Sequence, residues 1–248
     1  MFIAAVAVSE GREAWRGDTC CYRRTAQLLV LVTGHHASVG EGASQGDQTM
    51  LVRDYYEQSA RSYDSWMVGF DRYVLGRGRS RMCSRARGRT LEVAVGTGAN
   101  LTHYPPDVNL TGVDLSPSML AIAERKGRAL GLDLELAIGD AQALAFPDAQ
   151  FETVTTTLLL STVPDARLAA EEMRRVLRPG GRLLILDFAR SPLVPVQWLQ
   201  RALAPLTARS RFSLLRDPLD YLDAVGFAIE HVDRFRLGVI EEVVARKA

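Results

Sequence analysis

Two glycines and two aspartates stand just beyond predicted strands in the middle of the chain. Gly96 and Gly98 follow the strand-like run 90–95, Asp114 ends a second run, and Asp140 follows a third. In open α/β sheets, ligands bind beyond the carboxyl ends of the strands. Glycine lets the backbone approach a ligand closely, and carboxylates accept hydrogen bonds from a ribose diol or an adenine amino group. Together these residues predict a nucleoside site.

The glycine spacing separates the nucleotide-binding motifs that share this position. A nicotinamide or flavin site of the Gly-x-Gly-x-x-Gly type needs a third glycine for close helix packing, but that position is Leu101. A phosphate-binding P-loop needs a Gly-Lys-Ser/Thr sequence, which does not follow either. Asp114 also favours a free ribose diol over a 2′-phosphate. A nicotinamide oxidoreductase therefore stays only as an alternative.

The elements that must position these residues alternate between strand and helix. Strands are expected over 90–95, 109–114, 132–140, 151–160 and 182–188, and helices over 98–105, 116–131 and 164–177. Ser116 and Pro117 predict a capped start for the second of these helices. A helix at 217–226 then precedes two strands, 227–235 and 238–248, whose short connection implies a hairpin. This alternation predicts a doubly wound α/β sheet of seven strands, mostly parallel and ending in an antiparallel hairpin strand.

Three parts are expected along the chain. Residues 1–49 show no sustained periodicity, end in a Gly/Ser-rich stretch and are expected to be poorly ordered, with Met50 as an alternative native start. Residues 50–89 are expected to form lid helices, because their aromatic residues recur at three- and four-residue steps. The same stripe also fits a helix packed on a core, the commoner use of such a pattern. Residues 90–248 form the main domain, with an irregular insert at 191–215.

Composition excludes several classes of protein. A formal net charge of +1 does not indicate a general nucleic-acid binder. Three cysteines, two of them adjacent, fit neither a zinc site nor a secreted disulfide framework, and this favours a reduced, cytoplasmic setting. The His35–His36 pair has too few companions to bind a metal. Apolar runs near the start are shorter than the ~20 residues that span a bilayer, so no transmembrane segment is expected.

Seven arginines lie between Arg72 and Arg89, and no acidic residue follows Asp71 in that stretch. Such clusters are most often solvated surface. The alternative is peripheral contact with an anionic acceptor, a lipid or a membrane surface.

Four ordered blocks of sequence resemble the class I S-adenosylmethionine-dependent methyltransferases. They are LEVAVGTGANL, LTGVDLSPSML, GDAQALAFPDAQFETV and LRPGGRLLILDF, and they cover about residues 90–190. They look most like the branch with quinone-biosynthesis C-methyltransferases and bacterial phospholipid N-methyltransferases, and ARSYDSW around Tyr63 resembles the N-terminal helix of that branch. The resemblance implies a Rossmann-like fold and S-adenosyl-L-methionine as cofactor.

The resemblance also implies roles for individual residues. Gly96, Thr97 and Gly98 would wrap the methionine portion, Asp114 would bind the ribose, and Asp140 with the Ala141 amide would bind the adenine. Thr157 would line the pocket near the sulfonium. The expected cofactor site is completed by Tyr63, Glu92, Asn100 and Leu115. Ala94 departs from the family pattern, which has glycine there, and its methyl group is expected to narrow the pocket slightly.

The implied reaction asks little acid–base chemistry of the protein. Methyl transfer from a sulfonium is an in-line displacement, so placing the reactants and excluding water can supply the catalysis. A general base is needed only if the acceptor must lose a proton; candidates are His103, Asp187, His231 and the tyrosines of the N-terminal helix. His231 fits a structural role better, and no catalytic residue or metal ligand is assigned.

The acceptor is expected to be a small organic molecule such as a quinone, a lipid or a specialised metabolite. The insert 191–215 mixes apolar residues with arginines, which suggests an apolar or amphipathic acceptor with a polar or negative head. A helix that merely shields the sheet is an equal alternative for this insert. A cofactor-binding scaffold without methylation is the alternative for the whole chain.

Overall fold

The computed structural model describes residues 44–208 and 212–248 of the 248-residue chain. The expectations for residues 1–43, including the His35–His36 pair, lie outside this part. Helix α3 (Gln45–Phe70) comes first, followed by the π-helical turn η1 (Asp71–Leu75) and helix α4 (Gly78–Cys83). The lid helices were expected from residue 50, but α3 begins earlier. The reason is a capping box, in which Ser44 and Asp47 bind each other's backbone amides.

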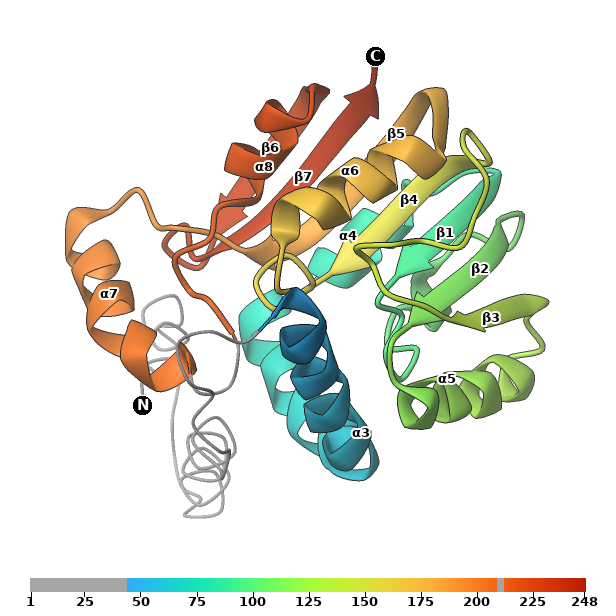
Figure 1. Ribbon diagram of the computed structural model, residues 1–248, viewed down its shortest axis with the longest axis horizontal. Helices are drawn as coiled ribbons and strands as arrows, with labels where there is room; N and C mark the ends of the chain where they lie inside the picture. Colours follow the sequence, from blue (N-terminus) through green and yellow to red (C-terminus); the bar gives the residue numbers. More distant parts are fainter. Residues whose placement is uncertain (1–43, 209–211) are drawn as a thin grey trace, which may run out of the picture.

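Seven strands form one sheet in the order β3-β2-β1-β4-β5-β7-β6 (Figure 1). The parallel strands are β1 (Arg89–Val93), β2 (Asn109–Asp114), β3 (Leu134–Ile138), β4 (Phe151–Thr157) and β5 (Leu177–Phe188). β7 (Ile240–Lys247) pairs antiparallel with both β5 and β6 (Phe227–Phe235). The predicted fold is therefore confirmed, including the terminal hairpin.

Short polar caps start the helices that follow the strands. Ser116 caps α5 (Pro117–Ala129) as predicted, because its hydroxyl accepts from the Met119 amide. Aspartates do the same for α6 (Ala166–Val176) and α8 (Pro218–Ala224). These caps satisfy amides that a helix start leaves without an intrahelical partner.

Three local expectations were wrong. The helix expected over 98–105 is only a 3₁₀ turn, η2 (Leu101–His103). The strand expected over 182–188 begins earlier, since β5 starts at Leu177 and its register against β4 shifts between Phe151 and Thr153. The insert 191–215 is not irregular, because α7 (Val194–Ala208) occupies most of it.

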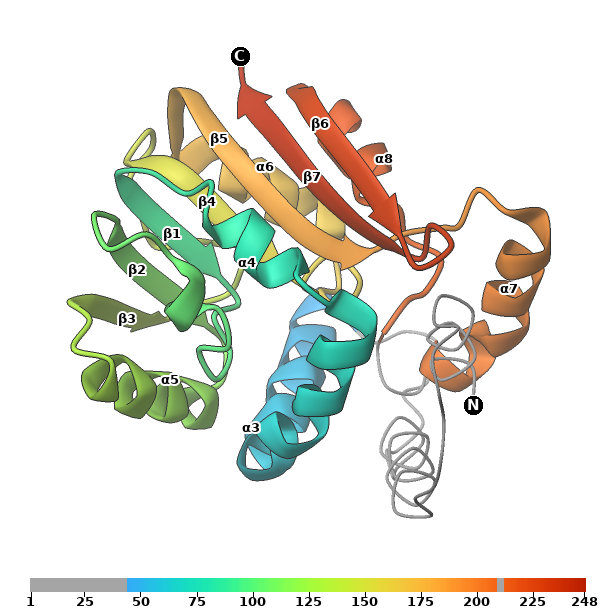
Figure 2. The same ribbon diagram turned by 180° about the vertical axis from the view of Figure 1, so that it is seen from behind.

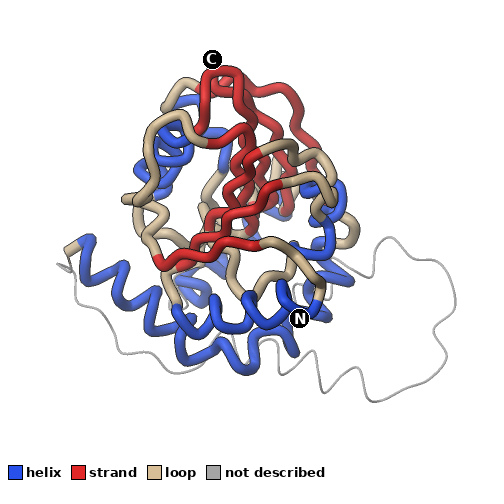
Figure 3. The backbone as a smooth tube through the Cα atoms, turned by 90° about the vertical axis from the view of Figure 1, so that its right-hand side faces the viewer, coloured by secondary structure: helices blue, strands red, loops and turns tan. Residues whose placement is uncertain are grey.

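Apolar residues cover both faces of the sheet. Along β5, Leu183 and Ile185 face a core cluster with α6, whereas Leu184 and Leu186 face a second cluster with α3, η1 and α4. This period of two is what a strand buried on both faces requires. Accordingly, α6 and α8 lie on one face in Figure 1 and α4 on the opposite face in Figure 2, and Figure 3 shows the strands running through the middle of the molecule.

Candidate functional site

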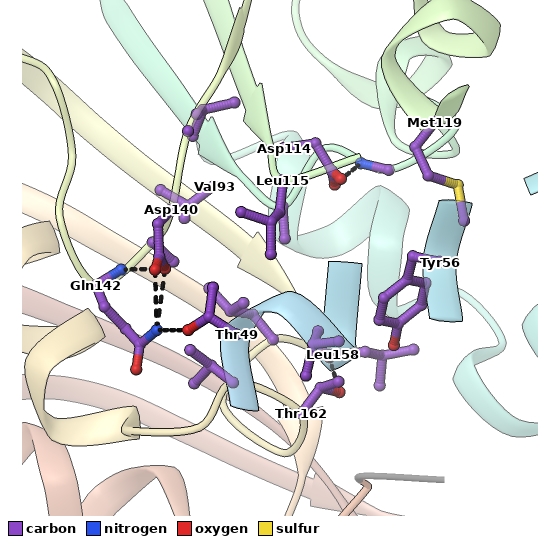
Figure 4. Close-up of a pocket in the computed structure, with 18 of the residues that line it drawn as sticks. Thr49, Tyr56, Val93, Asp114, Leu115, Met119, Asp140, Gln142, Leu158 and Thr162 are labelled. Atoms are coloured by element: carbon purple, nitrogen blue, oxygen red, sulfur yellow. Dashed lines mark hydrogen bonds between the residues drawn. The ribbon is translucent and has the colours of Figure 1, made fainter. Parts of the chain in front are cut away.

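One cavity lies at the carboxyl ends of the central strands (Figure 4). Strand order reverses between β1 and β4, which is where open α/β sheets bind ligands. Seven of the predicted cofactor residues line this cavity: Tyr63, Gly96, Asp114, Leu115, Asp140, Ala141 and Thr157. The other four, Glu92, Thr97, Gly98 and Asn100, lie outside its wall.

Asp114 joins the loop after β1 to the loop after β2. Its Oδ2 accepts from the Gly96 amide at 2.8 Å, and its Oδ1 accepts from the Ser116 amide at 2.9 Å. Burial raises the pKa of Asp114, while these amide hydrogen bonds act in the opposite direction. Each carboxylate oxygen has two acceptor positions, so the side chain keeps capacity for a ligand on the cavity wall.

The two loop glycines have different structural reasons. Gly96 has φ of +55°, and a Cβ there would meet nothing within 4 Å, so its position opens onto free space. Gly98 has φ of +77°, and a Cβ there would lie 2.6 Å from Leu101 Cδ1 and 3.2 Å from Ala123 Cα. Gly98 was expected to wrap the methionine portion together with Gly96. It allows the loop to pack on α5 and is not among the residues that line the cavity.

Two non-glycine residues of the cavity wall adopt left-handed backbone conformations. Ala94 has φ of +60° and Leu158 has φ of +58°. Left-handed conformations cost L-residues roughly 1–2 kcal/mol each. The conformation of Ala94 accounts for the glycine that the family pattern has at this position. Two of the five non-glycine residues with positive φ in the described part of the chain therefore follow β1 and β4 on the cavity wall.

Gln142 connects the third strand end to the start of α3, and sequence reasoning missed it. Its Nε2 donates to both carboxylate oxygens of Asp140 at 3.1 Å and to Thr49 Oγ1 at 3.0 Å (Figure 4). Its Oε1 accepts from Gln45 Nε2 at 3.1 Å and from the Asp165 amide at 2.9 Å. The only sequence signal was its place two residues after Asp140.

Glu92 lies beneath the cavity in a buried hydrogen-bond network. Its two oxygens accept from Asn100 Nδ2 at 2.7 Å and from the Tyr104 hydroxyl at 3.0 Å. Asn100 Nδ2 also donates to Thr157 Oγ1 at 2.9 Å, and Asn100 Oδ1 accepts from Arg79 Nη1 at 2.9 Å. Burial raises the pKa of Glu92 to about 7. Glu92 thus orients Asn100, which donates to Thr157 on the cavity wall.

Helix α3 forms one wall of the cavity and is fastened to the loops beneath it. Tyr56 and Tyr63 line the cavity, and Tyr63 also stacks edge-on against Trp66, so the aromatic stripe both packs and faces the site. Asp64 accepts from Thr97 Oγ1 at 2.6 Å and pairs with Lys126 of α5 at 2.7 Å. Thr97 therefore holds α3 rather than the cavity contents.

None of the three non-tyrosine candidate bases lines the cavity. Asp187 accepts from the Leu160 and Phe188 amides, each at 2.7 Å, and burial raises its pKa to about 6. His231 lies in strand β6 as expected, but it is exposed and not packed as a buried structural histidine, and His103 lies on the η2 turn. Burial raises the pKa of both cavity tyrosines, Tyr56 and Tyr63, which disfavours their use as bases. Residues 44–208 and 212–248 hold no cluster of metal ligands.

The arginine cluster 72–89 has acidic partners that its own sequence neighbourhood did not reveal. Arg79 pairs with Asp71 at 2.9 Å, and Arg81 pairs with Glu242 of β7 at 3.0 Å and with Asp233 of β6 at 3.1 Å. Three of the seven arginines, Arg79, Arg81 and Arg85, therefore form ion pairs. Strands distant in sequence supply the carboxylates for Arg81 and Arg85.

A second cavity of about 300 Å³ adjoins the first. Val52, Thr162 and Pro164 line both cavities. The rest of its wall comes from α3, α7 and the segment after α7: Gln48, Ala204, Thr207, Phe212, Ser213 and Arg216. Arg216 donates to the Leu160 carbonyl at 2.9 Å and to the Pro164 carbonyl at 3.1 Å, so it also holds the loop after β4.

Known proteins resemble this chain over its central region. A family model described as a methyltransferase domain matches residues 91–185. Phosphatidylethanolamine N-methyltransferase of Cereibacter sphaeroides is 37% identical over 156 residues, which cover 58% of this chain and 75% of that protein. Demethylmenaquinone methyltransferase of Thermus thermophilus is 41% identical over 111 residues, which cover 44% of this chain and half of that relative's length.

The fold also occurs in solved structures. A methyltransferase from Thermotoga maritima, described as S-adenosylmethionine-dependent and as a possible histamine N-methyltransferase, superimposes with a TM-score of 0.62. It is 19% identical, and the match covers 79% of this chain and all of that one. At this identity the likeness concerns the fold alone.

Proposed function

We propose an acceptor for this enzyme from one premise: the chain belongs to the class I S-adenosylmethionine-dependent methyltransferases. As a member it uses S-adenosylmethionine and transfers a methyl group. The names of its relatives refer to phosphatidylethanolamine, a phospholipid with an amine, and to demethylmenaquinone, a quinone precursor. Both molecules have apolar tails. We propose a small apolar or amphipathic acceptor of this kind, bound in the second cavity.

The first cavity is proposed as the donor site. Asp114 has free acceptor positions for a ribose diol, and Asp140 with the Ala141 amide stands at the neighbouring strand end for an adenine ring. Gly96 leaves open space where the methionine portion would pass, and Thr157 and Tyr63 close the far wall. The chemistry of these groups fits S-adenosylmethionine, which supplies a methyl group activated by its sulfonium.

The shared wall of the two cavities is the observation that carries the acceptor proposal. Val52, Thr162 and Pro164 face both cavities, so a molecule in the second lies beside the contents of the first. Apolar side chains such as Ala204 and Phe212 contribute to the second cavity. Arg216 is its only charged lining residue, and the described part of the chain offers it carbonyl partners rather than a carboxylate. An apolar body with a polar or negative head suits these walls.

The protein's own contribution is proposed to be placement and exclusion of water. The wall of the first cavity offers Tyr56, Tyr63, Asp114 and Asp140 as ionisable groups, and the two aspartates are proposed for the donor. Burial raises the pKa of both tyrosines. Catalysis by near-attack positioning is therefore favoured over general-base catalysis.

Methyl transfer from isotopically labelled S-adenosylmethionine tests the proposal. Purified protein is mixed with a demethylated naphthoquinol or with phosphatidylethanolamine vesicles, and label is followed into the lipid fraction. We expect transfer to one of these acceptors and loss of transfer in Ala204→Trp, which fills the second cavity, with unchanged calorimetric binding of S-adenosylhomocysteine. Ala121→Trp on the exposed side of α5 is the matched control. Donor binding without transfer to any apolar acceptor would favour a scaffold and contradict the proposal.

A further inference from the structure

Helix α7 turns its apolar side outward. Trp198 is 65% exposed and Val194 is 63% exposed, whereas Gln200 and Thr207 are buried. Arg201 is the only exposed residue between Pro192 and Leu206 that is not apolar. The exposed apolar residues, called here the α7 face, are Pro192, Leu193, Val194, Pro195, Trp198, Leu199, Ala202, Pro205 and Leu206. A helix on a water-facing surface has the opposite arrangement.

The buried side of α7 fixes this orientation. The Gln200 side chain is fully buried; its Oε1 accepts from the Ser191 amide, and its Nε2 donates to the Ala189 and Leu214 carbonyls, all at 2.9 Å. Rotating the helix would break all three hydrogen bonds and leave a buried amide without partners, at a cost for each lost bond. The outward position of Trp198 and Leu199 is therefore built into the fold.

The chain segment that carries the α7 face contains arginines but no carboxylate. No aspartate or glutamate occurs between Asp187 and Asp217, a stretch with five arginines, of which Arg190 pairs with Asp220 of α8 at 3.4 Å. On α7 itself, the Arg201 guanidinium lies 6.0 Å from the centre of the Trp198 ring. Tryptophan, aliphatic residues and arginine together, without carboxylates, are the composition of segments that lie in the interface of an anionic membrane.

We propose that the α7 face docks on the surface of an anionic lipid bilayer. No helix among residues 44–208 and 212–248 is long and apolar enough to cross a membrane, so the contact is peripheral. The surface differs from the arginine cluster 72–89, where carboxylates of β6 and β7 already pair with Arg81 and Arg85. Arginine beside the α7 face complements anionic headgroups, and its outward apolar side chains fit a bilayer better than they fit water.

The position of α7 gives this contact a use. Figures 1 and 2 show α7 at the end of the molecule away from β1, β2 and β3. The other side of the helix contributes Ala204 and Thr207 to the second cavity. Resting on the proposed function, docking would leave only α7 between that cavity and the bilayer, where an amphipathic acceptor resides.

Vesicle flotation with the full chain tests the docking surface. We expect binding to vesicles of phosphatidylglycerol and phosphatidylcholine, weaker binding to pure phosphatidylcholine, and roughly tenfold or greater weakening in the double variant Trp198→Ser, Leu199→Ser. Val68→Ser with Tyr73→Ser removes apolar side chains of similar exposure from α3 and η1 and is expected to bind as the parent does. Thermal melting verifies that all variants are folded.

Charge and depth are tested separately. Arg201→Glu is expected to abolish the preference for anionic vesicles, whereas Arg125→Glu on the exposed side of α5 keeps it. Trp198 fluorescence is expected to be quenched by brominated lipid in a protein whose other two tryptophans, Trp15 and Trp66, are replaced by Phe. Three results would overturn the proposal: no vesicle binding by the parent, binding lost only on replacing Arg72 and Arg77, or a dimer that Trp198→Ser makes monomeric. Because flotation needs no acceptor, its outcome is independent of the methylation assay.

Discussion

Asp114 binds the protein's own backbone and still has acceptor positions directed to the cavity. Its two amide partners, Gly96 and Ser116, lie on successive loops, so the carboxylate shapes the site before any ligand arrives. Groups that are fixed in this way lose little freedom on binding, which favours affinity. The residue should therefore matter more for binding the donor than its two visible hydrogen bonds suggest.

Replacing Asp114 with alanine is expected to weaken binding of S-adenosylhomocysteine by about 1–3 kcal/mol, because charge-assisted hydrogen bonds to the ribose are lost. Isothermal calorimetry measures this change directly. Asp107→Ala, at an exposed aspartate of the loop before β2, serves as the control and should leave the affinity unchanged. Equal affinities of parent and Asp114→Ala would show that the ribose binds elsewhere.

Gln142 shows how one side chain can control an element. It holds Thr49 and Gln45 of α3 as well as Asp140 at the tip of the third strand. Gln142→Ala removes these bonds, each worth about 1 kcal/mol, and is expected to let the first turns of α3 open more often. Hydrogen exchange should become faster over residues 49–56 and stay unchanged in the sheet.

Gln58→Ala provides the comparison, since Gln58 lies on the same helix but is exposed. It should leave exchange at the start of α3 as in the parent. If both variants exchange alike over residues 49–56, the Gln142 contacts do not hold the helix.

Most strands and helices could be predicted from local sequence patterns, and those that could not have identifiable physical causes. Short runs of apolar and β-branched residues predicted β1, β2, β4 and β5, because strands buried on both faces are apolar along most of their length. A helix in the insert 191–215 was predicted only as an alternative, because the apolar side of α7 faces out and Pro192, Pro195 and Pro205 read as breaks. The first turn of α3 was missed because glycine and serine around Ser44 resemble a loop, although Ser44 and Asp47 form a capping box.

Site residues were predictable where a strand end places them. Asp114 and Asp140 end neighbouring parallel strands, and topology alone brings them to one cavity. Gly98 and Thr97 share the motif but serve the packing of α5 and α3, which spacing does not reveal. Gln142 and Arg79 act through partners tens of residues away, and no local pattern records such contacts.

At the scale of the whole molecule, buried carboxyl groups make stability depend on pH. Burial raises the pKa of Glu92 from 4.5 to about 7, although hydrogen bonds from Asn100 and Tyr104 oppose the shift. Between these two values the folded protein binds more protons than the unfolded chain, so its stability falls as pH rises. The loss of stability from ionising buried Glu92 is absent below pH 4.5, and above pH 7 it reaches its full value of about 3 kcal/mol.

Glu92→Gln removes this ionisation while keeping the shape of the side chain. The unfolding free energy of the variant minus that of the parent is expected to be about 2 kcal/mol larger at pH 8 than at pH 5. Urea denaturation at the two pH values measures the gain, and Asp187, present in both proteins, cancels from the comparison. Glu135→Gln, an exposed position on β3, should show no such gain. A pH-independent difference for Glu92→Gln would mean that Glu92 ionises normally in the fold.

The order of the last two strands bears on how a nascent chain can fold. β6 leaves the ribosome before β7, yet β6 borders β7 in the sheet, and β7 alone separates it from β5. Until residues 240–247 emerge, β5 must keep one edge unpaired and β6 must wait without a neighbour. Pairing β7 with β5 joins segments about sixty residues apart in the sequence, and such long-range pairing is slow. Until it occurs, the unpaired edge of β5 is open to aggregation during synthesis.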